Sequence, residues 1–178
     1  MTSFQITELK SFMGKLLGTD CFDSFLLAGA QVVTAVEYTI DGRIHPEFYT
    51  KEELQDPHVC PCEFVSWAQM RPILFQMIRG KRSPSRFKLM LHLNPEYVPA
   101  VMKGADPSLL PEQVKALVLT VRYEDGRAFL VTGTAFHSFV LDKTLDACWD
   151  KTIRRFLTSR QIAYTEPSDT YFNFSSSD

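Results

Sequence analysis

The chain has 178 residues and a mass of 20.4 kDa, a size that suits one domain built around a single hydrophobic core. With 45% hydrophobic and 22% charged residues, the composition is that of a globular protein and excludes disorder throughout. The formal net charge of −2 excludes a polycation that coats nucleic acid with its whole surface. No apolar run approaches the length needed to cross a bilayer, so we expect no membrane partner.

The N-terminus and the cysteines indicate a cytoplasmic protein. The first residues lack the basic start and apolar stretch of a secretory signal. A chain of this length can build a core without disulfides, and so few cysteines are best explained as free thiols in a reducing compartment. The cysteines are Cys21, Cys60, Cys62 and Cys148.

The first elements are predicted from the spacing of apolar residues. A short strand over 3–6 precedes a helix that Thr7 can cap and Gly18 can end. The apolar face of this helix is formed by Leu9, Phe12, Met13, Leu16 and Leu17. Two β-rich runs follow, over 22–28 and 31–40. Asp41-Gly42 then predicts a tight hairpin turn, after which 43–49 returns as an edge strand that contains Pro46.

The second half predicts more helices and strands. A loop over 51–63 leads to a helical pattern over 64–79, which Pro72 either kinks or divides into two helices. A final helix begins at Asp142, which can cap it. The elements between them are a strand over 86–93, a short helix over 95–103, and strands over 115–124 and 127–139 around the turn Asp125-Gly126.

These elements predict one α+β domain over residues 1–164, with a largely antiparallel sheet and about four packed helices. A loosely ordered tail would follow over 165–178. Asp41-Gly42-Arg43 recurs as Asp125-Gly126-Arg127, so an internal duplication and two chance hairpins both stay open. Two β-α-β-β-β units in this order are similar to a domain of the sliding DNA clamps, and the similarity is one of topology only.

The most unusual segment runs from Phe64 to Pro95 and carries six cations but no carboxylate. Guanidinium groups this close together can hold phosphate oxygens, and Gly80 and the nearby serines can add donors. The alternative is structural: cations favour the end of a helix and can pair with carboxylates elsewhere. The candidate polyanion-binding residues are Arg71, Arg79, Lys81, Arg82, Arg86 and Lys88. A second basic set lies on the last helix, where aspartates alternate with it as on a solvated face: Lys143, Lys151, Arg154, Arg155 and Arg160. Of these, Arg154, Arg155 and Arg160 at the end of the helix could join the first set.

Metal and catalytic motifs are weaker. His58, Cys60 and Cys62 are possible ligands, but Cys-Pro-Cys is tighter than usual zinc spacing and no second pair follows, so we expect no metal and no cofactor. His92 falls in a predicted strand, opposite in parity to its apolar neighbours, which favours a solvent-side position over a catalytic one. No nucleophile, phosphate-loop or dinucleotide motif is present, so we expect no catalytic residues.

A set of short motifs is spread along the chain: Phe12-Met13, Lys15-Leu16-Leu17, Phe22-Asp23-Ser24-Phe25, Ile40-Asp41-Gly42, Arg71-Pro72, Gly80-Lys81-Arg82, Thr132-Gly133-Thr134 and Leu141-Asp142-Lys143. Together they resemble an uncharacterised bacterial family, mainly clostridial, whose domain has no known function. The resemblance runs from about Phe4 to Ile162 and implies a cytoplasmic bacterial protein. It implies no activity, so no functional residue is taken from it.

The sequence therefore favours a non-enzymatic module whose basic segment binds nucleic acid or another polyanion. Two alternatives stay open. One is a protein-interaction or assembly module, a homo-oligomer included, that uses the edge strand near His45 or the apolar tail. The other is an enzyme with an unrecognised site.

Overall fold

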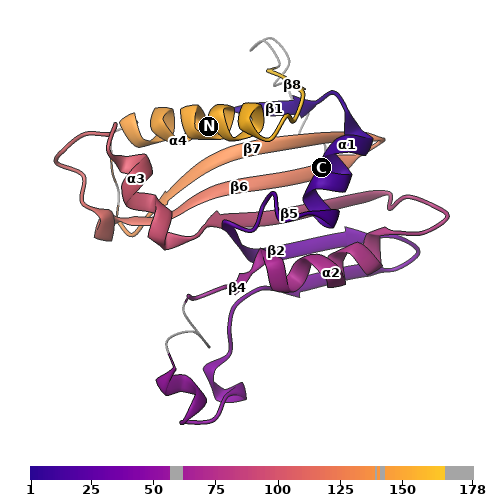
Figure 1. The fold of residues 1–178 in the computed structure, drawn as a ribbon, viewed down its shortest axis with the longest axis horizontal. Coiled ribbons are helices and arrows are strands. Elements are labelled where there is room, and N and C mark those ends of the chain that lie inside the picture. Colours follow the sequence, from indigo (N-terminus) through magenta and orange to yellow (C-terminus); the bar gives the residue numbers. More distant parts are fainter. Residues whose placement is uncertain (57–61, 139, 141–142, 167–178) are drawn as a thin grey trace, which may run out of the picture.

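The protein is described by a computed structural model that places residues 1–56, 62–138, 140 and 143–166 (Figure 1). Eight strands in this part form one sheet, and every pairing is antiparallel. The order is β3-β2-β5-β6-β7-β1-β8, with β4 paired to β2. The strands are β1 (Ser3–Ile6), β2 (Phe25–Val33), β3 (Glu37–Asp41), β4 (Val65–Ser66), β5 (Arg86–Leu93), β6 (Val114–Glu124), β7 (Arg127–Phe136) and β8 (Tyr164–Thr165). The expected α+β class is confirmed.

Three helices cover one face of the sheet. In Figure 1, α1 (Leu9–Gly18), α2 (Trp67–Ile78) and α4 (Thr144–Ser159) lie in front of the strands, and the short α3 (Val98–Met102) lies at one end. Trp67 on α2 and Trp149 on α4 are buried in the same core cluster as the strand residues Leu89 and Leu119. The hydrophobic core therefore lies between the sheet and this single layer of helices.

Away from the end where the short α3 lies, the opposite face of the sheet is not covered by a helix in the described structure. Strand β5 shows this most clearly, because its residues alternate between buried and accessible positions. Phe87, Leu89, Leu91 and Leu93 point into the core. Between them, Arg86, Lys88, Met90 and His92 point to the other side, which we call the uncovered face.

The hairpin expected at Asp41-Gly42 is wrong. The chain turns earlier, between β2 and β3, where the backbone N–H of Thr34 donates to the carbonyl of Val36. Gly42 does not have a positive φ; it lets the backbone approach Leu27 so closely that a Cβ would overlap the Leu27 carbonyl. By contrast, Asp125 (φ 51°) and Gly126 (φ 72°) form the expected tight turn between β6 and β7. The two Asp-Gly-Arg tripeptides thus occupy different structures.

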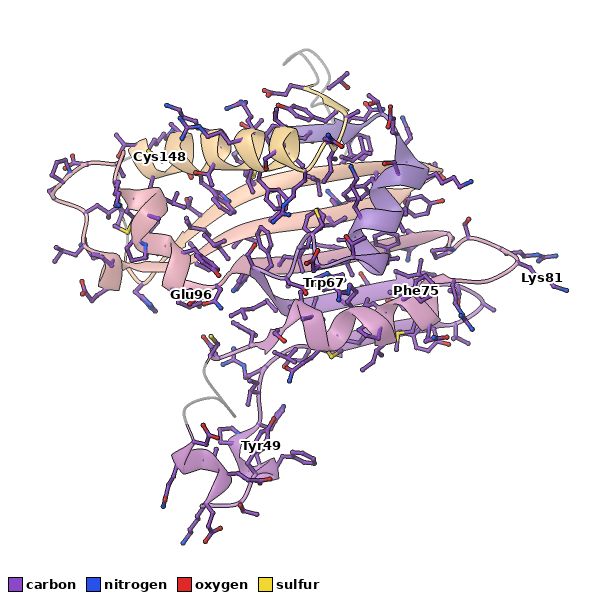
Figure 2. All side chains as sticks on the ribbon, viewed as in Figure 1. Tyr49, Trp67, Phe75, Lys81, Glu96 and Cys148 are labelled. Atoms are coloured by element: carbon purple, nitrogen blue, oxygen red, sulfur yellow. The ribbon has the colours of Figure 1, made fainter. Side chains whose placement is uncertain are left out.

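The expected return strand over 43–49 is also wrong. Arg43 forms only an isolated bridge with Phe64, and a 3₁₀ turn, η1 (Pro46–Phe48), follows. A second turn, η2 (Glu53–Gln55), lies further along the same segment. Residues 44–56, which we call the arm, project away from the sheet, as the position of Tyr49 shows in Figure 2.

Two helices begin elsewhere than expected. The N-cap of α1 is Glu8 and not Thr7, and α2 begins at Trp67 and not at Phe64. Of the two alternatives at Pro72, the structure has one helix with Pro72 inside it. Asp142, the expected cap of α4, lies outside the described residues, and α4 begins at Thr144. Thr165 belongs to β8, whereas residues 167–178 of the expected tail lie outside the description. The short segment over 95–103 consists of η3 (Pro95–Tyr97) and α3.

No helix among the described residues has both the length and the apolar character that a bilayer crossing requires.

Candidate nucleic-acid interface

Two cations stand side by side in the middle of the uncovered face. Lys88 on β5 and Arg122 on β6 are directly opposite each other in the antiparallel register. Their outer neighbours in the same row are uncharged: Gln31 on β2 and the half-buried Phe129 on β7. Like charges in this arrangement repel each other and destabilise the pairing. The pair is therefore hard to explain by stability alone.

The next row of the uncovered face adds two more cations. Arg86 on β5 faces Glu124 on β6, and Glu124 faces Arg127 across the β6–β7 turn. All three side chains are exposed. The row continues the positive surface of Lys88 and Arg122 towards one end of the sheet, with one carboxylate between two guanidinium groups.

A basic loop lies beyond that end. Residues 80–85 connect α2 to β5, and Ser85 anchors the loop by donating from both its backbone N–H and its hydroxyl to the Val33 carbonyl. Lys81 and Arg82 are exposed, and Figure 2 shows Lys81 at the tip. Arg79, which ends α2, lies over the ring of Phe75 at 5.7 Å. We call the following residues the basic face: Lys81, Arg82, Arg86, Lys88, Arg122 and Arg127.

The cations of the basic face make no ion pair with any described residue. Pairs with a nitrogen-to-carboxylate distance within 4.0 Å occur elsewhere in the described chain, at Arg43, Arg71 and Arg154 for example. Glu124 takes part in none of them. The basic face is therefore a positive surface that the described part of the fold leaves uncompensated at contact distance.

Arg71 has a different role from the other candidate residues. Its guanidinium donates to the Asp23 carboxylate at 2.5 Å and also to the Thr19 carbonyl, so it ties α2 to the turn after α1. Both side chains of the ion pair are mostly buried, with 20% and 30% exposed. We therefore leave Arg71 out of the basic face.

Replacing Arg71 tests this division. We expect Arg71→Ala to lower the free energy of unfolding by about 1–2 kcal/mol, because Asp23 loses its charged donor in a partly buried position. Chemical denaturation measures this loss. Affinity for nucleic acid should change less than twofold, and a loss as large as that caused by replacing Lys88 would contradict the division.

The second basic set belongs to the other side of the molecule. Arg154 on α4 makes two hydrogen bonds to Glu166, at 2.7 and 2.9 Å, and lies over the ring of the core residue Phe4. Hydrogen bonding to Arg154 lowers the pKa of Glu166. Arg160 lies over Phe156. Because α4 covers the helical face, the fold does not bring this set onto the uncovered face.

A cavity of about 330 Å³ opens where β5 ends. The uncovered face contributes His92 to it, and η3 and α3 contribute an apolar wall. The ring of Phe64 meets the ring of His92 edge to face, with 5.0 Å between centroids. Burial lowers the pKa of His92 below its ordinary 6.5, so the ring is neutral at pH 7. Sequence reasoning placed His92 on the solvent side but missed this enclosure, which the packing of Phe64, η3 and α3 creates.

The cavity wall is fixed by the base of the arm. Arg43 pairs with Glu63 at 2.6 Å, and its guanidinium lies 5.4 Å from the centroid of the Phe64 ring. The two chain segments at the base of the arm are also joined by backbone hydrogen bonds, in which Ile44 donates to Glu63 and Val65 donates to Gly42. These contacts hold Phe64 in position against His92.

The described residues contain no cluster of three or more potential metal ligands. Of the possible ligands in the Cys-Pro-Cys segment, His58 and Cys60 lie outside the described residues, and Cys62 is half-buried. Burial raises the pKa of the Cys62 thiol, which makes it a poorer nucleophile and ligand at neutral pH.

Comparisons with known proteins give one family. A family model described as a family of unknown function, DUF5721, matches residues 15–165. No curated protein and no solved structure matches the chain. The likeness of its topology to a sliding-clamp domain therefore stays a prediction.

Proposed function

The chain belongs to the DUF5721 family, whose function is unknown, and we propose that it is a non-enzymatic module that binds single-stranded nucleic acid through its basic face. The observation that carries the proposal is the Lys88–Arg122 pair. Two cations stand directly opposite each other on an open sheet, and no described carboxylate neutralises them at contact distance.

A polyanion would relieve the repulsion in this pair. Phosphate groups placed between Lys88 and Arg122 would be attracted by both side chains at once, and the condensed counterions of the nucleic acid would be released. Arg86 and Arg127 in the next row, on either side of Glu124, extend this positive surface, and their guanidinium groups can hold phosphate oxygens in pairs. The repulsion that costs stability in the free protein thus favours the bound state.

The shape and composition of the face favour a single strand over a duplex. An open sheet offers a broad surface on which unpaired bases can lie, as in other sheet-based readers of single strands. Phe129 stands beside Arg122 and is half-buried, and Met90 is 38% exposed beside Lys88. These side chains give the bases apolar contacts next to the cations that hold the backbone.

The test is a salt titration of binding. Fluorescence anisotropy with a labelled single-stranded oligonucleotide should show affinity that falls steeply as salt rises. Replacing Lys88 and Arg122 by Gln should weaken binding by about tenfold at low salt and reduce the salt slope by about 1.4, because two phosphate contacts are lost. The matched control replaces Lys10 and Lys151 by Gln, which removes the same charge from exposed positions on the helical face.

Equal losses in the two double variants would show that only net charge matters and would remove the proposal. Absence of binding at low salt would do the same and would favour a second candidate, a protein-interaction module. That candidate is supported by the arm, on which Phe48 is 83% exposed and Leu54 is 42% exposed. An oligomer in sedimentation that Phe48→Ser dissociates would then identify the arm as the contact.

A further inference from the structure

The cavity at His92 lies on the same face as the cations. Lys88, Met90 and His92 are alternate residues of β5, so their side chains share the uncovered face. Lys88 and His92 are four positions apart on the strand, a distance of roughly 13 Å. A nucleic acid whose phosphates contact Lys88 and Arg122 therefore runs within reach of the cavity.

We propose that this cavity receives one unstacked base of a single strand whose phosphates lie on the basic face. The inference rests on the proposed function and assigns to it a base-binding site. The face would then have two parts: cations that hold the backbone without regard to sequence, and a pocket that holds a base.

The size of the cavity fits one base. Its 330 Å³ corresponds to the space of about eleven water molecules in the liquid, and a base has roughly ten non-hydrogen atoms. The sugar and phosphate of the same nucleotide would stay outside on the face. Lys115 on the lining is exposed and can meet the phosphate of the same nucleotide.

The lining offers the two kinds of contact that a base needs. The flat sides of the base would contact apolar groups of the lining. One of these groups is the aromatic ring of Phe64, which Arg43 holds in place. The apolar residues contributed by η3, α3 and η4 (Pro111–Gln113) are Pro95, Val98, Pro99 and Pro111. Proline and aromatic side chains give this contact at little cost in conformational entropy.

His92 supplies the polar contact. It makes no hydrogen bond to another described residue, and no buried side-chain nitrogen or oxygen in the described structure lacks a partner. Both ring nitrogens are therefore reached by solvent. A neutral imidazole has one donor and one acceptor, and the edge of every base offers complementary groups. The lowered pKa of His92 keeps the ring in this neutral form at pH 7.

The experiment compares an oligothymidine of about twelve nucleotides with an abasic sugar–phosphate strand of the same length and charge. We expect the native protein to bind oligothymidine about tenfold more tightly than the abasic strand. His92→Leu should bring the affinity for oligothymidine close to that for the abasic strand. It should leave the affinity for the abasic strand and the salt slope unchanged.

Two further variants distinguish loss of the polar contact at His92 from loss of binding through a disturbed fold. His92→Gln keeps a donor and an acceptor, so its affinity for oligothymidine should exceed that of His92→Leu by several-fold. His45→Leu, at an exposed position on the arm, is the matched control and should bind as the native protein does. Equal binding of the two strands, or an equal loss for both strands in His92→Leu, would overturn the base site alone. Failure of both strands to bind at low salt would overturn the proposed function as well.

Discussion

Gly42→Ala is expected to unfold the protein or to lower its free energy of unfolding by about 3 kcal/mol or more. The added Cβ would overlap the carbonyl oxygen of Leu27 and lie 2.7 Å from its carbonyl carbon, both of which are backbone atoms of a central strand. Relief would require β2 to shift. The shift would break the hydrogen bonds that Gly42 makes with Ala28 (3.1 Å) and Val65 (2.9 Å). These bonds hold the base of the arm.

Thermal and chemical denaturation measure this effect, and Gly14→Ala is the control. Gly14 lies inside α1, and a Cβ there would meet no atom within 4 Å. Alanine should therefore raise the free energy of unfolding by about 0.5–1 kcal/mol through its better helix propensity. If Gly42→Ala leaves the free energy of unfolding unchanged or raises it as Gly14→Ala does, the close approach at Gly42 is not the constraint we describe.

The second large effect is expected for Trp149→Ala, which should lower the free energy of unfolding by about 3–5 kcal/mol. Trp149 is 1% exposed and joins α4 to the sheet, where its indole N–H donates to the Val118 carbonyl at 2.8 Å. Its ring also packs against Phe25, with 6.4 Å between centroids. Truncation removes these contacts and leaves a large cavity under α4.

Two variants are compared with Trp149→Ala in the same denaturation assay. Trp149→Phe is the conservative replacement, and Phe48→Ala is the control at an exposed position. Phe keeps most of the apolar contact but loses the hydrogen bond, so its cost should be clearly smaller than that of Ala. Phe48 is 83% exposed on the arm, and its removal should change stability by less than about 0.5 kcal/mol. A small loss for Trp149→Ala would mean that α4 contributes little to the core.

The parts of the fold that depend on local patterns were predictable. Strand β5 lies at 86–93 as predicted, because strict alternation is the direct signature of a sheet with one covered face. The turn at Asp125-Gly126 was predictable because two adjacent residues need a positive φ. The same reasoning failed at Gly42, which is required by the close approach of Leu27 in the neighbouring strand β2 and not by a turn. The actual turn at Thr34 has no glycine to mark it.

The candidate site was predictable only in part, for the same reason. The run of cations from Arg79 to Lys88 is visible in the sequence, but strand register decides which of them share a face. Arg122 and Arg127 belong to the basic face because β6 and β7 pair beside β5, and their only signal in the sequence is alternation. The ion pair of Arg71 with Asp23, 48 residues earlier, has no signal in the sequence at all.

The position of β1 has a consequence for biosynthesis. This strand lies between β7 and β8, so its hydrogen-bonding partners are residues 129–131 and 164–165. During translation, β1 leaves the ribosome long before either partner exists, and it cannot complete the sheet until almost the whole described chain has been made. Contacts between such distant segments slow folding. The growing chain will therefore leave the apolar side chains of β1 without their strand partners until β7 has been made.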